Sequence, residues 1–327
     1  MEKELVLGID IGGTYTKLGL VDVNGEILSI KKFSTEAKKP FAEFEKMLHS
    51  EINALLSTLK PDQKIMAIGV GAPNANGYSG NMEHAVNFRW GDEVPLVASI
   101  KKVLNLPISL ANDANASAVG ELQFGLGKGM KHFVVLTLGT GLGSGIISNG
   151  ELLIGHNGMA GEIGHVNVVP DGRQCNCGLK GCLETYVSVT GIRRTIFELI
   201  AEMNVDSELR SISFDDMTGE IISDAALNGD AIALKAFQET AEFLGTQMAD
   251  TAAHLDPEAF ILLGGLSKAG DILLKPVVAA MEQHIFNAYK GKVKVLMADM
   301  PGNHSILGAA ALGWRAVGQT NSSLESW

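Results

Sequence analysis

The chain has 327 residues, a length that predicts two ordinary domains, each with its own core, more readily than one large domain. Its 37 acidic and 26 basic residues give a formal net charge of −11 without any dense stretch of Lys and Arg, which argues against nucleic acid as a partner. No apolar run is long enough to span a membrane, and the N-terminal residues lack the features of a signal peptide, so we expect a cytoplasmic protein that does not enter a membrane.

The first predicted elements are three strands in an antiparallel meander. Two apolar strands within residues 5–23 flank a glycine turn, and a third at 26–33 follows Asn24-Gly25, a dipeptide typical of tight hairpins. The glycine turn combines a carboxylate, backbone N–H donors and a hydroxyl, which favours a phosphate cradle with a metal-facing acid; its residues are Asp10, Gly12, Gly13 and Thr14. An ordinary glycine hairpin explains the turn equally well. Lys17 either adds charge there or is a solvated surface lysine.

Helices and strands alternate in the next segment. Apolar spacing predicts helices at 41–59 and 96–104, and buried strands at 65–70 and 107–110. Residues 74–93 read as a long polar loop, and long loops in compact domains are usually functional.

Asp113 is the candidate general base. It lies where the strand at 107–110 ends and a helix at 116–125 begins, flanked by Asn112 and Asn115, at a predicted junction between domains. A carboxylate there can accept the proton of a substrate hydroxyl while its neighbours hold other hydroxyls. Capping of the following helix would explain Asp113 equally well.

The second half repeats the opening plan, which predicts two domains of related design. A strand at 133–138, a glycine turn at 139–143 and strands at 146–148 and 152–154 lie around a second Asn-Gly pair. The two glycine turns are expected to hold the phosphates of a nucleotide through backbone donors. The second turn contributes Gly139, Thr140 and Gly141, and Gly264-Gly265 would let a base or ribose lie close to the backbone.

The last predicted elements are helices at 189–203, 224–255 and 306–317 and strands at 260–263 and 293–297. The helix at 224–255 has a possible break at Asn228-Gly229. Glycine is frequent, with 38 residues, which suggests loops whose backbone must approach a ligand closely.

All three cysteines lie within residues 155–184, close to a histidine. Together they supply the four ligands of a tetrahedral structural zinc, namely His165, Cys175, Cys177 and Cys182. A disulfide that leaves one cysteine over, or a thiol cluster without a role, is the alternative. Glu162 and Glu184 bracket this zinc loop and could accept the hydroxyls of a polyol, and His165 could offer its second ring nitrogen to a ligand.

Five segments together resemble the ROK family, a group of bacterial sugar kinases and sugar-responsive repressors. They are DIGGTYTKLGLVD at 10–22, GVGAPN at 69–74, NDANASAVGE at 112–121, LGTGLGSGI at 138–146, and EIGH at 162–165 joined to CNCGLKGCLE at 175–184. The resemblance implies a two-domain α/β fold of the actin-like ATPase (ribonuclease H-like) type with a cleft between the domains, often in a homodimer. We expect an N-terminal domain at 1–115, on which a C-terminal helix at about 305–318 packs, and a C-terminal domain at 116–304 that carries the zinc loop.

The resemblance also implies roles for individual residues. Asp113 resembles the catalytic base that activates the primary hydroxyl of the sugar for attack on the γ-phosphate of ATP. The residues similar to sugar-binding positions are Gly71, Asn87, Asn112, Asp113, Glu162, His165 and Glu184. Those similar to nucleotide-binding positions are Asp10, Gly12, Gly13, Thr14, Lys17, Gly139, Thr140, Gly141, Gly264 and Gly265. The family's adenosine-side motif commonly has three successive glycines, whereas here Leu263 precedes Gly264-Gly265.

These expectations combine into a Mg²⁺-dependent transfer of the ATP γ-phosphoryl group to the 6-hydroxyl of a hexose, glucose first. N-acetylmannosamine, N-acetylglucosamine and fructose are the alternative substrates, and a sugar sensor without catalysis is the alternative class. Repressors of the family carry a helix-turn-helix domain ahead of the first motif, whereas nine residues precede Asp10 here, so DNA binding is not expected.

Overall fold

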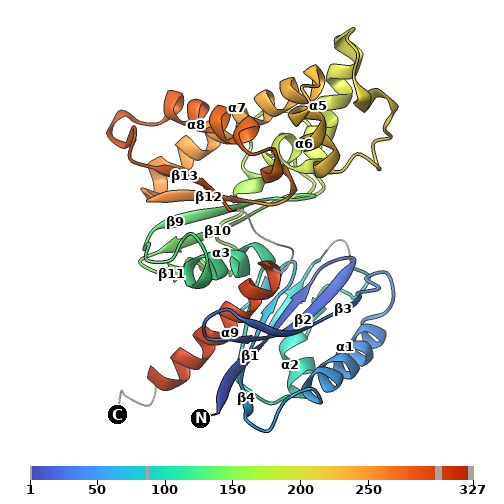
Figure 1. Ribbon diagram of the computed structural model, residues 1–327, viewed down its shortest axis with the longest axis vertical. Helices are drawn as coiled ribbons and strands as arrows, with labels where there is room; N and C mark the ends of the chain where they lie inside the picture. Colours follow the sequence, from blue (N-terminus) through green and yellow to red (C-terminus); the bar gives the residue numbers. More distant parts are fainter. Residues whose placement is uncertain (1, 86–87, 299–303, 323–327) are drawn as a thin grey trace. The chain divides into compact units, whose positions relative to one another are not determined.

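A computed structural model describes residues 2–85, 88–298 and 304–322, which form two compact units (Figure 1). Unit 1 comprises Met1–Gly129, Leu152–Ala160 and Pro301–Trp327, and unit 2 comprises Met130–Glu151 and Gly161–Met300. No helix among the described residues has both the length and the apolar character needed to cross a membrane.

The sheet of unit 1 has five strands in the order β3-β2-β1-β4-β8. The strands are β1 (Lys3–Ile11), β2 (Tyr15–Asp22), β3 (Ile27–Ser34), β4 (Gln63–Gly71) and β8 (Ile108–Ala111). Strands β1, β2 and β3 pair antiparallel, which confirms the predicted meander, and β4 pairs parallel with both β1 and β8.

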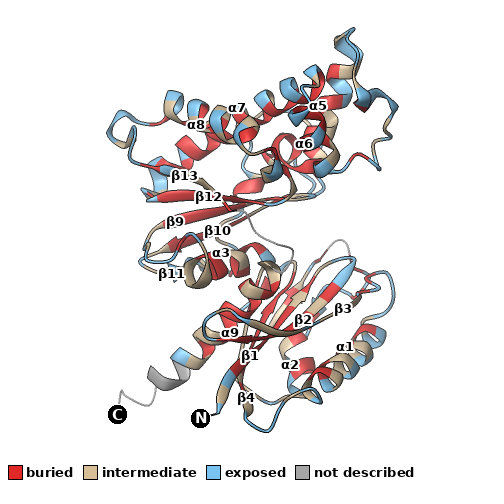
Figure 2. Ribbon diagram, viewed as in Figure 1, coloured by how far each residue is buried: buried red, intermediate tan, exposed pale blue. Residues whose placement is uncertain are grey.

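Successive side chains of β1 lie on opposite faces of this sheet, as strand geometry requires. Leu5 and Leu7 join a core with α1 (Phe41–Leu56), which buries Phe44 and Leu48, whereas Val6 packs with α9 (His304–Ser322). Figure 2 shows the central strands of both units as largely buried.

Helix α3 (Asp113–Phe124) belongs entirely to unit 1, although the predicted domain boundary at 115/116 runs through it. The reason is its packing on α9: Ala116 and Val119 share a buried cluster with Ala311 and Leu312. Helix α9 likewise belongs to unit 1. The chain therefore leaves unit 1 after α3, not before it.

Helix α9 lies directly on the backbone of β1 and β4. A Cβ atom at Gly69 would lie 1.7 Å from the Ala309 carbonyl oxygen, and one at Gly8 would lie 2.9 Å from the Ile306 carbonyl oxygen. We expected the glycines of this chain to serve loops that approach a ligand. At Gly8 and Gly69 that expectation is wrong, because these glycines allow a helix to contact a sheet without intervening side chains.

The sheet of unit 2 repeats the plan, with the order β11-β10-β9-β12-β13. Its strands are β9 (Phe133–Leu138), β10 (Leu142–Ser148), β11 (Glu151–Leu152), β12 (Ala259–Leu263) and β13 (Lys294–Met297). Strand β9 pairs antiparallel with β10 and parallel with β12, as β1 does with β2 and β4. The predicted repeat of the opening design in the second half is thus confirmed.

The helices of unit 2 are α4 (Glu184–Val187), α5 (Val189–Glu202), α6 (Gly219–Leu227), α7 (Ala231–Leu255) and α8 (Asp271–His284). The predicted break at Asn228-Gly229 separates α6 from α7; Gly229 has φ 86°, and Asp230 caps α7 by accepting from the Ile232 and Ala233 N–H groups. Helix α8 was not predicted. Pro276 lies inside it, and proline usually ends a helix.

Residues 74–93 are not simply a loop, as we had predicted. They contribute a three-stranded sheet of β5 (Ala75–Asn76), β6 (Asn81–Glu83) and β7 (Glu93–Val94), paired antiparallel. Strands of two or three residues are too short to show a period in the sequence. Helix α2 (Leu96–Lys101) follows and is shorter than predicted.

The turn between β2 and β3 depends on a buried carboxylate. Asp22 Oδ1 accepts from the N–H groups of Asn24 at 3.0 Å and Glu26 at 2.9 Å, and Oδ2 lies 3.3 Å from Lys3 Nζ. Burial alone would raise the pKa of Asp22, but these backbone donors and the Lys3 ammonium outweigh it and hold the pKa below its usual range. Asp22 thus stabilises the predicted Asn24-Gly25 turn in its ionised form.

Replacing Gly69 with alanine is expected to destabilise unit 1 by about 3 kcal/mol, because the new methyl group meets backbone atoms that no side-chain rotation can move. Urea denaturation measures the change. Gly318→Ala is the control, since Gly318 lies exposed on α9, with nothing within 4 Å of a Cβ. Equal urea midpoints for the two variants would contradict the packing of α9 described above.

Asp22→Asn is expected to lower the free energy of unfolding by about 1 kcal/mol at neutral pH, because the amide oxygen still accepts hydrogen bonds but the charge is lost. A lowered folded-state pKa stabilises the protein above the unfolded pKa of about 3.9, and this contribution disappears as the pH falls through the folded value. Denaturation of both proteins across this pH range should show the difference shrinking in acid. A difference that does not depend on pH would contradict the charged role.

Candidate active site and metal centre

The first turn of α3 presents the Asp113 carboxylate to solvent. The Ala114 N–H donates to Asn112 Oδ1 at 2.9 Å and to Asp113 Oδ1 at 2.8 Å, and Asn112 is the N-cap residue of the helix. Asp113 is the first helical residue and is exposed. Asn112 is therefore the capping residue, and the Asp113 carboxylate also accepts a first-turn N–H, at a helix N-terminus where negative charge is favourable.

Of the residues predicted near Asp113, the structure brings some to the same place and not others. Gly71 ends β4 beside this turn, since a Cβ there would lie 3.2 Å from Ala116 Cβ and 3.9 Å from Asp113 Cα. Asn115 was expected to hold substrate hydroxyls, but it is buried, with 6% of its surface exposed. Asn87 lies outside the described residues.

Hydrogen bonds at Gly12 fix the glycine turn between β1 and β2, while the next two residues are exposed to solvent. Gly12 N–H donates to the Tyr15 carbonyl at 3.0 Å, and the Thr35 hydroxyl donates to the Gly12 carbonyl at 2.7 Å. Gly13 and Thr14 are exposed, and nothing lies within 4 Å of a Cβ built at Gly13. An exposed turn rich in backbone donors can receive the oxygens of a phosphate.

Asp10 lies at the end of β1 and faces Lys17 and Ser305. Burial raises the pKa of Asp10, while the Ser305 hydrogen bond and the Lys17 charge act in the opposite direction. Lys17 Nζ also donates to Ser305 Oγ at 3.2 Å, so Lys17 is partly buried among polar groups and is not a solvated surface lysine. Sequence reasoning missed Ser305, because 288 positions separate it from Lys17.

In unit 2, the glycine turn after β9 is tied to the start of α5. Val189 N–H donates to the Gly139 carbonyl at 2.9 Å and the Thr190 hydroxyl donates to the Thr140 carbonyl at 2.8 Å. Gly264 lies against the same strand end, since a Cβ there would lie 2.4 Å from the Leu138 carbonyl oxygen. The structure therefore brings the two predicted nucleotide segments of this unit together at one end of its sheet.

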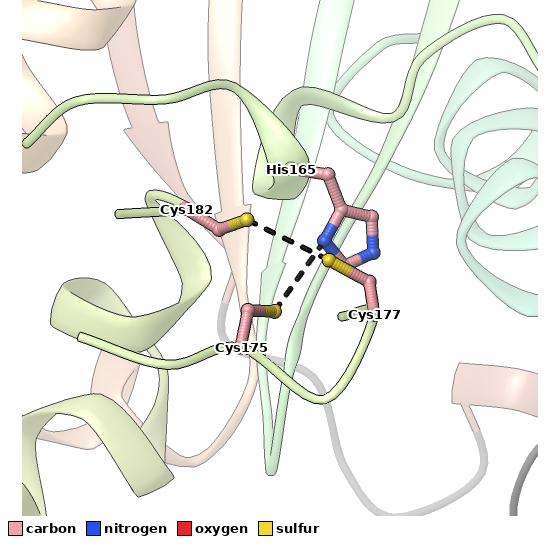
Figure 3. A group of neighbouring side chains, drawn as sticks. All are labelled: His165, Cys175, Cys177 and Cys182. Carbon is pink, nitrogen blue, oxygen red and sulfur yellow. Dashed lines mark hydrogen bonds between the residues drawn. The ribbon is translucent and has the colours of Figure 1, made fainter. Parts of the chain in front are cut away.

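The zinc loop folds so that four ligand atoms converge (Figure 3). One ligand atom each from His165, Cys175, Cys177 and Cys182 lies within 4.8 Å of the others. Cys177 Sγ lies 3.6 Å from Cys182 Sγ, and Cys175 Sγ lies 3.8 Å from His165 Nδ1. The three cysteines are free thiols, so the disulfide alternative is wrong.

These distances fit a tetrahedral metal. Zinc–sulfur bonds of about 2.3 Å in a tetrahedral site place sulfur atoms about 3.8 Å apart. Burial raises the pKa of the Cys175 thiol to about 12 and also raises the pKa of Cys182. A divalent cation would compensate the charge of thiolates that burial otherwise disfavours, so the donor set is compatible with zinc.

The sugar-site residues predicted around this zinc loop do gather there. His165 directs Nδ1 toward the sulfur atoms, and its Nε2 lies 3.9 Å from Glu162 Oε2. Glu184 Oε2 accepts from the Leu142 N–H at 2.9 Å, and a Cβ at Gly141 would lie 2.4 Å from the same oxygen. Glu184 thus joins the zinc loop to the glycine turn.

Comparison with known proteins agrees with this geometry. The model of the ROK family matches residues 6–316. A glucokinase of Halalkalibacterium halodurans is 36% identical over 328 residues, which cover 98% of each chain. The solved structure of a ROK family glucokinase from Streptomyces griseus, in complex with glucose and AMPPNP, superposes with a TM-score of 0.79 at 35% identity over 95% of this chain and 99% of that one.

A regulator is also similar. The structure of a ROK family transcriptional regulator, a homologue of the E. coli MLC protein, gives a TM-score of 0.87 at 26% identity, over 96% of this chain and 78% of the regulator. Both neighbours support the predicted two-domain actin-like ATPase fold, which the paired five-stranded sheets display. The chain belongs to the ROK family, within which it is a sugar kinase of the glucokinase-like type.

Proposed function

We propose that this kinase transfers the γ-phosphoryl group of ATP to the 6-hydroxyl of a hexose, with glucose as the preferred sugar. The observation that carries the proposal is the exposed Asp113 carboxylate at the start of α3, where Asn112 already provides the cap. The glucose and AMPPNP bound to the related Streptomyces griseus enzyme support the choice of substrates.

In the proposed reaction, Asp113 accepts the proton of the sugar hydroxyl as that oxygen attacks the γ-phosphorus. The leaving ADP keeps the bridging oxygen, and the protein contributes mainly by positioning the reactants and stabilising charge. The exposed backbone of Gly13 and Thr14 and the turn at Gly139 and Thr140 are proposed to hold phosphates. Asp10 would hold Mg²⁺, which, when bound with ATP, neutralises part of the phosphate charge.

We propose that the sugar hydroxyls bind to a set of hydrogen-bond acceptors and donors. Their residues are Gly71, Asn87, Asn112, Glu162, His165 and Glu184. Carboxylates accept hydrogen bonds from hydroxyl groups, and imidazole can donate or accept one. His165 can serve two purposes, because its Nδ1 faces the thiols and leaves Nε2 beside Glu162.

The metal is proposed to be a structural zinc held by His165, Cys175, Cys177 and Cys182. Four protein ligands complete a tetrahedral site and leave no position for a reacting water. The site would therefore fix the zinc loop and with it Glu162 and Glu184. A homodimer is proposed from the family resemblance, and a cytoplasmic location from the free thiols, which suit a reducing compartment.

The assay that tests this function couples ADP release to a panel of sugars: glucose, fructose, N-acetylglucosamine and N-acetylmannosamine. We expect the highest kcat/KM with glucose. Asp113→Asn should lower kcat by about a thousandfold, because a positioned base contributes about that factor, while sugar affinity is kept. Asp271→Asn is the matched control, since Asp271 is also an exposed first residue of a helix.

The outcomes separate the alternatives. If no sugar supports ADP release above background, the proposed kinase function fails. Preference for an N-acetylated sugar or fructose would leave the reaction class intact and replace the substrate. Turnover by Asp113→Asn equal to that of the control would remove Asp113 from its role as the base.

Elemental analysis of protein purified without added metal is expected to find one zinc per chain. Cys177→Ser should reduce this content and lower the midpoint of thermal unfolding, because the ligand set loses an exposed thiolate. Ser211→Ala, at an exposed hydroxyl outside the zinc loop, serves as the control. Full zinc content in Cys177→Ser, or no zinc in the unsubstituted protein, would refute the assignment.

A further inference from the structure

Arg173 lies two positions before Cys175, and the sequence assigns it no role. Its side chain is only 15% exposed, although a guanidinium is always charged at neutral pH. A buried charge is costly unless hydrogen bonds and an opposite charge compensate it. The partners of Arg173 therefore show what its burial stabilises.

The guanidinium of Arg173 uses its planar set of donors on α4 and α5. Nη1 donates to the carbonyls of Thr185 at 2.9 Å and Gly191 at 3.1 Å. Nη2 donates to the Thr195 hydroxyl at 3.0 Å and pairs with Glu198. One side chain thus connects the zinc loop to both helices.

The backbone of Arg173 and the face of its guanidinium make further contacts that strengthen this connection. The Arg173 N–H donates to the Tyr186 hydroxyl oxygen at 3.0 Å, and the guanidinium carbon lies 4.6 Å from the centre of the Tyr186 ring. The Gly181 N–H donates to the Arg173 carbonyl at 2.9 Å. A cation over an aromatic face is stabilised by the ring's quadrupole.

Of these hydrogen bonds, the one from Arg173 to the Thr185 carbonyl is relevant to the proposed sugar site. Helix α4 begins at Glu184 and ends at Val187, and the Val189 N–H donates to Gly139, not to Thr185. The Thr185 carbonyl is therefore one of the last carbonyls of a helix, without a partner in the helix itself. Arg173 supplies that partner and places a positive charge at the carbonyl end of α4, where it is favourable.

Thr185 directly follows Glu184, whose carboxylate accepts from Leu142. We propose that Arg173 is a positioning residue that fixes α4, and so directs Glu184 toward the sugar, independently of the metal. The inference rests on the proposed function, in which Glu184 binds sugar hydroxyls. The Cys182 thiol anchors the segment before Glu184, and Arg173 anchors the residue after it.

A neighbouring arginine provides the matched control. Arg194 Nη1 donates to the Gln174 carbonyl at 2.9 Å, so it also links α5 to the zinc loop, but this hydrogen bond does not reach α4. Arg173→Lys keeps the charge, while an ammonium cannot reproduce the fork that reaches Thr185, Gly191 and Thr195 together. Comparison of Arg173→Ala, Arg173→Lys and Arg194→Ala therefore distinguishes a general contact with the zinc loop from the positioning of Glu184.

Initial rates are measured against glucose at saturating ATP and against ATP at saturating glucose, together with zinc content. Arg173→Ala is expected to raise the KM for glucose by about tenfold to a hundredfold, the effect usual for partners of a binding group. The kcat and the KM for ATP should change much less, and the zinc content should stay as in the unsubstituted protein. Arg173→Lys should give an intermediate KM for glucose, and Arg194→Ala a nearly unchanged one.

An unchanged KM for glucose in Arg173→Ala, or equal effects from Arg194→Ala, overturns the proposal. Loss of zinc together with loss of activity toward both substrates also overturns it, because Arg173 would then only keep the loop folded. If Arg173→Ala does not fold, Arg173→Lys decides: a KM like that of the unsubstituted protein rejects the positioning role. If the unsubstituted protein phosphorylates no sugar, the proposed function fails first and the role of Arg173 in sugar binding fails with it.

Discussion

Unit 1 depends on the direct contact between the backbone of α9 and the backbones of β1 and β4. Gly8 and Gly69 leave no side chain between helix and sheet, so the helix axis has little freedom to shift. The same helix crosses α3 closely, since a Cβ at Gly120 would lie 2.9 Å from Gly308 Cα. The close approach of α9 therefore fixes the position of α3, whose first residue is Asp113.

The first turn of α9 also contributes polar groups to the surroundings of the phosphate turn. Ser305 bonds to Asp10 and Lys17, and His304 Nε2 lies 3.1 Å from the buried carboxylate of Glu121 in α3. A segment near the end of the chain thus stabilises charged residues near its beginning. Through these contacts α9 helps to determine the geometry of the proposed phosphate site.

In unit 2, the corresponding constraint is a set of side-chain and backbone contacts that converge on the zinc loop. Thiols, imidazole, the Arg173 guanidinium and the Leu142 N–H all act on the short stretch around Glu184. The zinc loop contains several glycines with positive φ, among them Gly178 at 93° and Gly181 at 76°, so its backbone has few repeating hydrogen bonds of its own. Side-chain contacts therefore supply the rigidity that secondary structure would otherwise give.

The parts of this molecule that the sequence could predict are those specified by neighbouring residues. The strands on each side of the glycine turns, the Asn24-Gly25 turn and the break before Asp230 follow from local patterns, and the four candidate metal ligands are close in the sequence. Ser305 and Arg173 could not be assigned, because their partners lie far along the chain or are backbone carbonyls that any residue possesses. The short strands β5, β6 and β7 depend on pairing with one another, which leaves no period in the sequence.

Fold similarity alone does not separate a sugar kinase from a sugar-responsive regulator. The regulator structure has a TM-score of 0.87 and the glucokinase structure one of 0.79, so the shared architecture accommodates both activities. Recognition of a sugar hydroxyl requires only a hydrogen-bond acceptor, which an asparagine amide provides as well as a carboxylate. Proton removal requires a base. Of the two adjacent residues Asn112 and Asp113 at the start of α3, Asp113 can act as a base, whereas Asn112 caps the helix. The carboxylate at position 113 therefore offers the base that the proposed phosphoryl transfer needs, beside an asparagine that caps the helix.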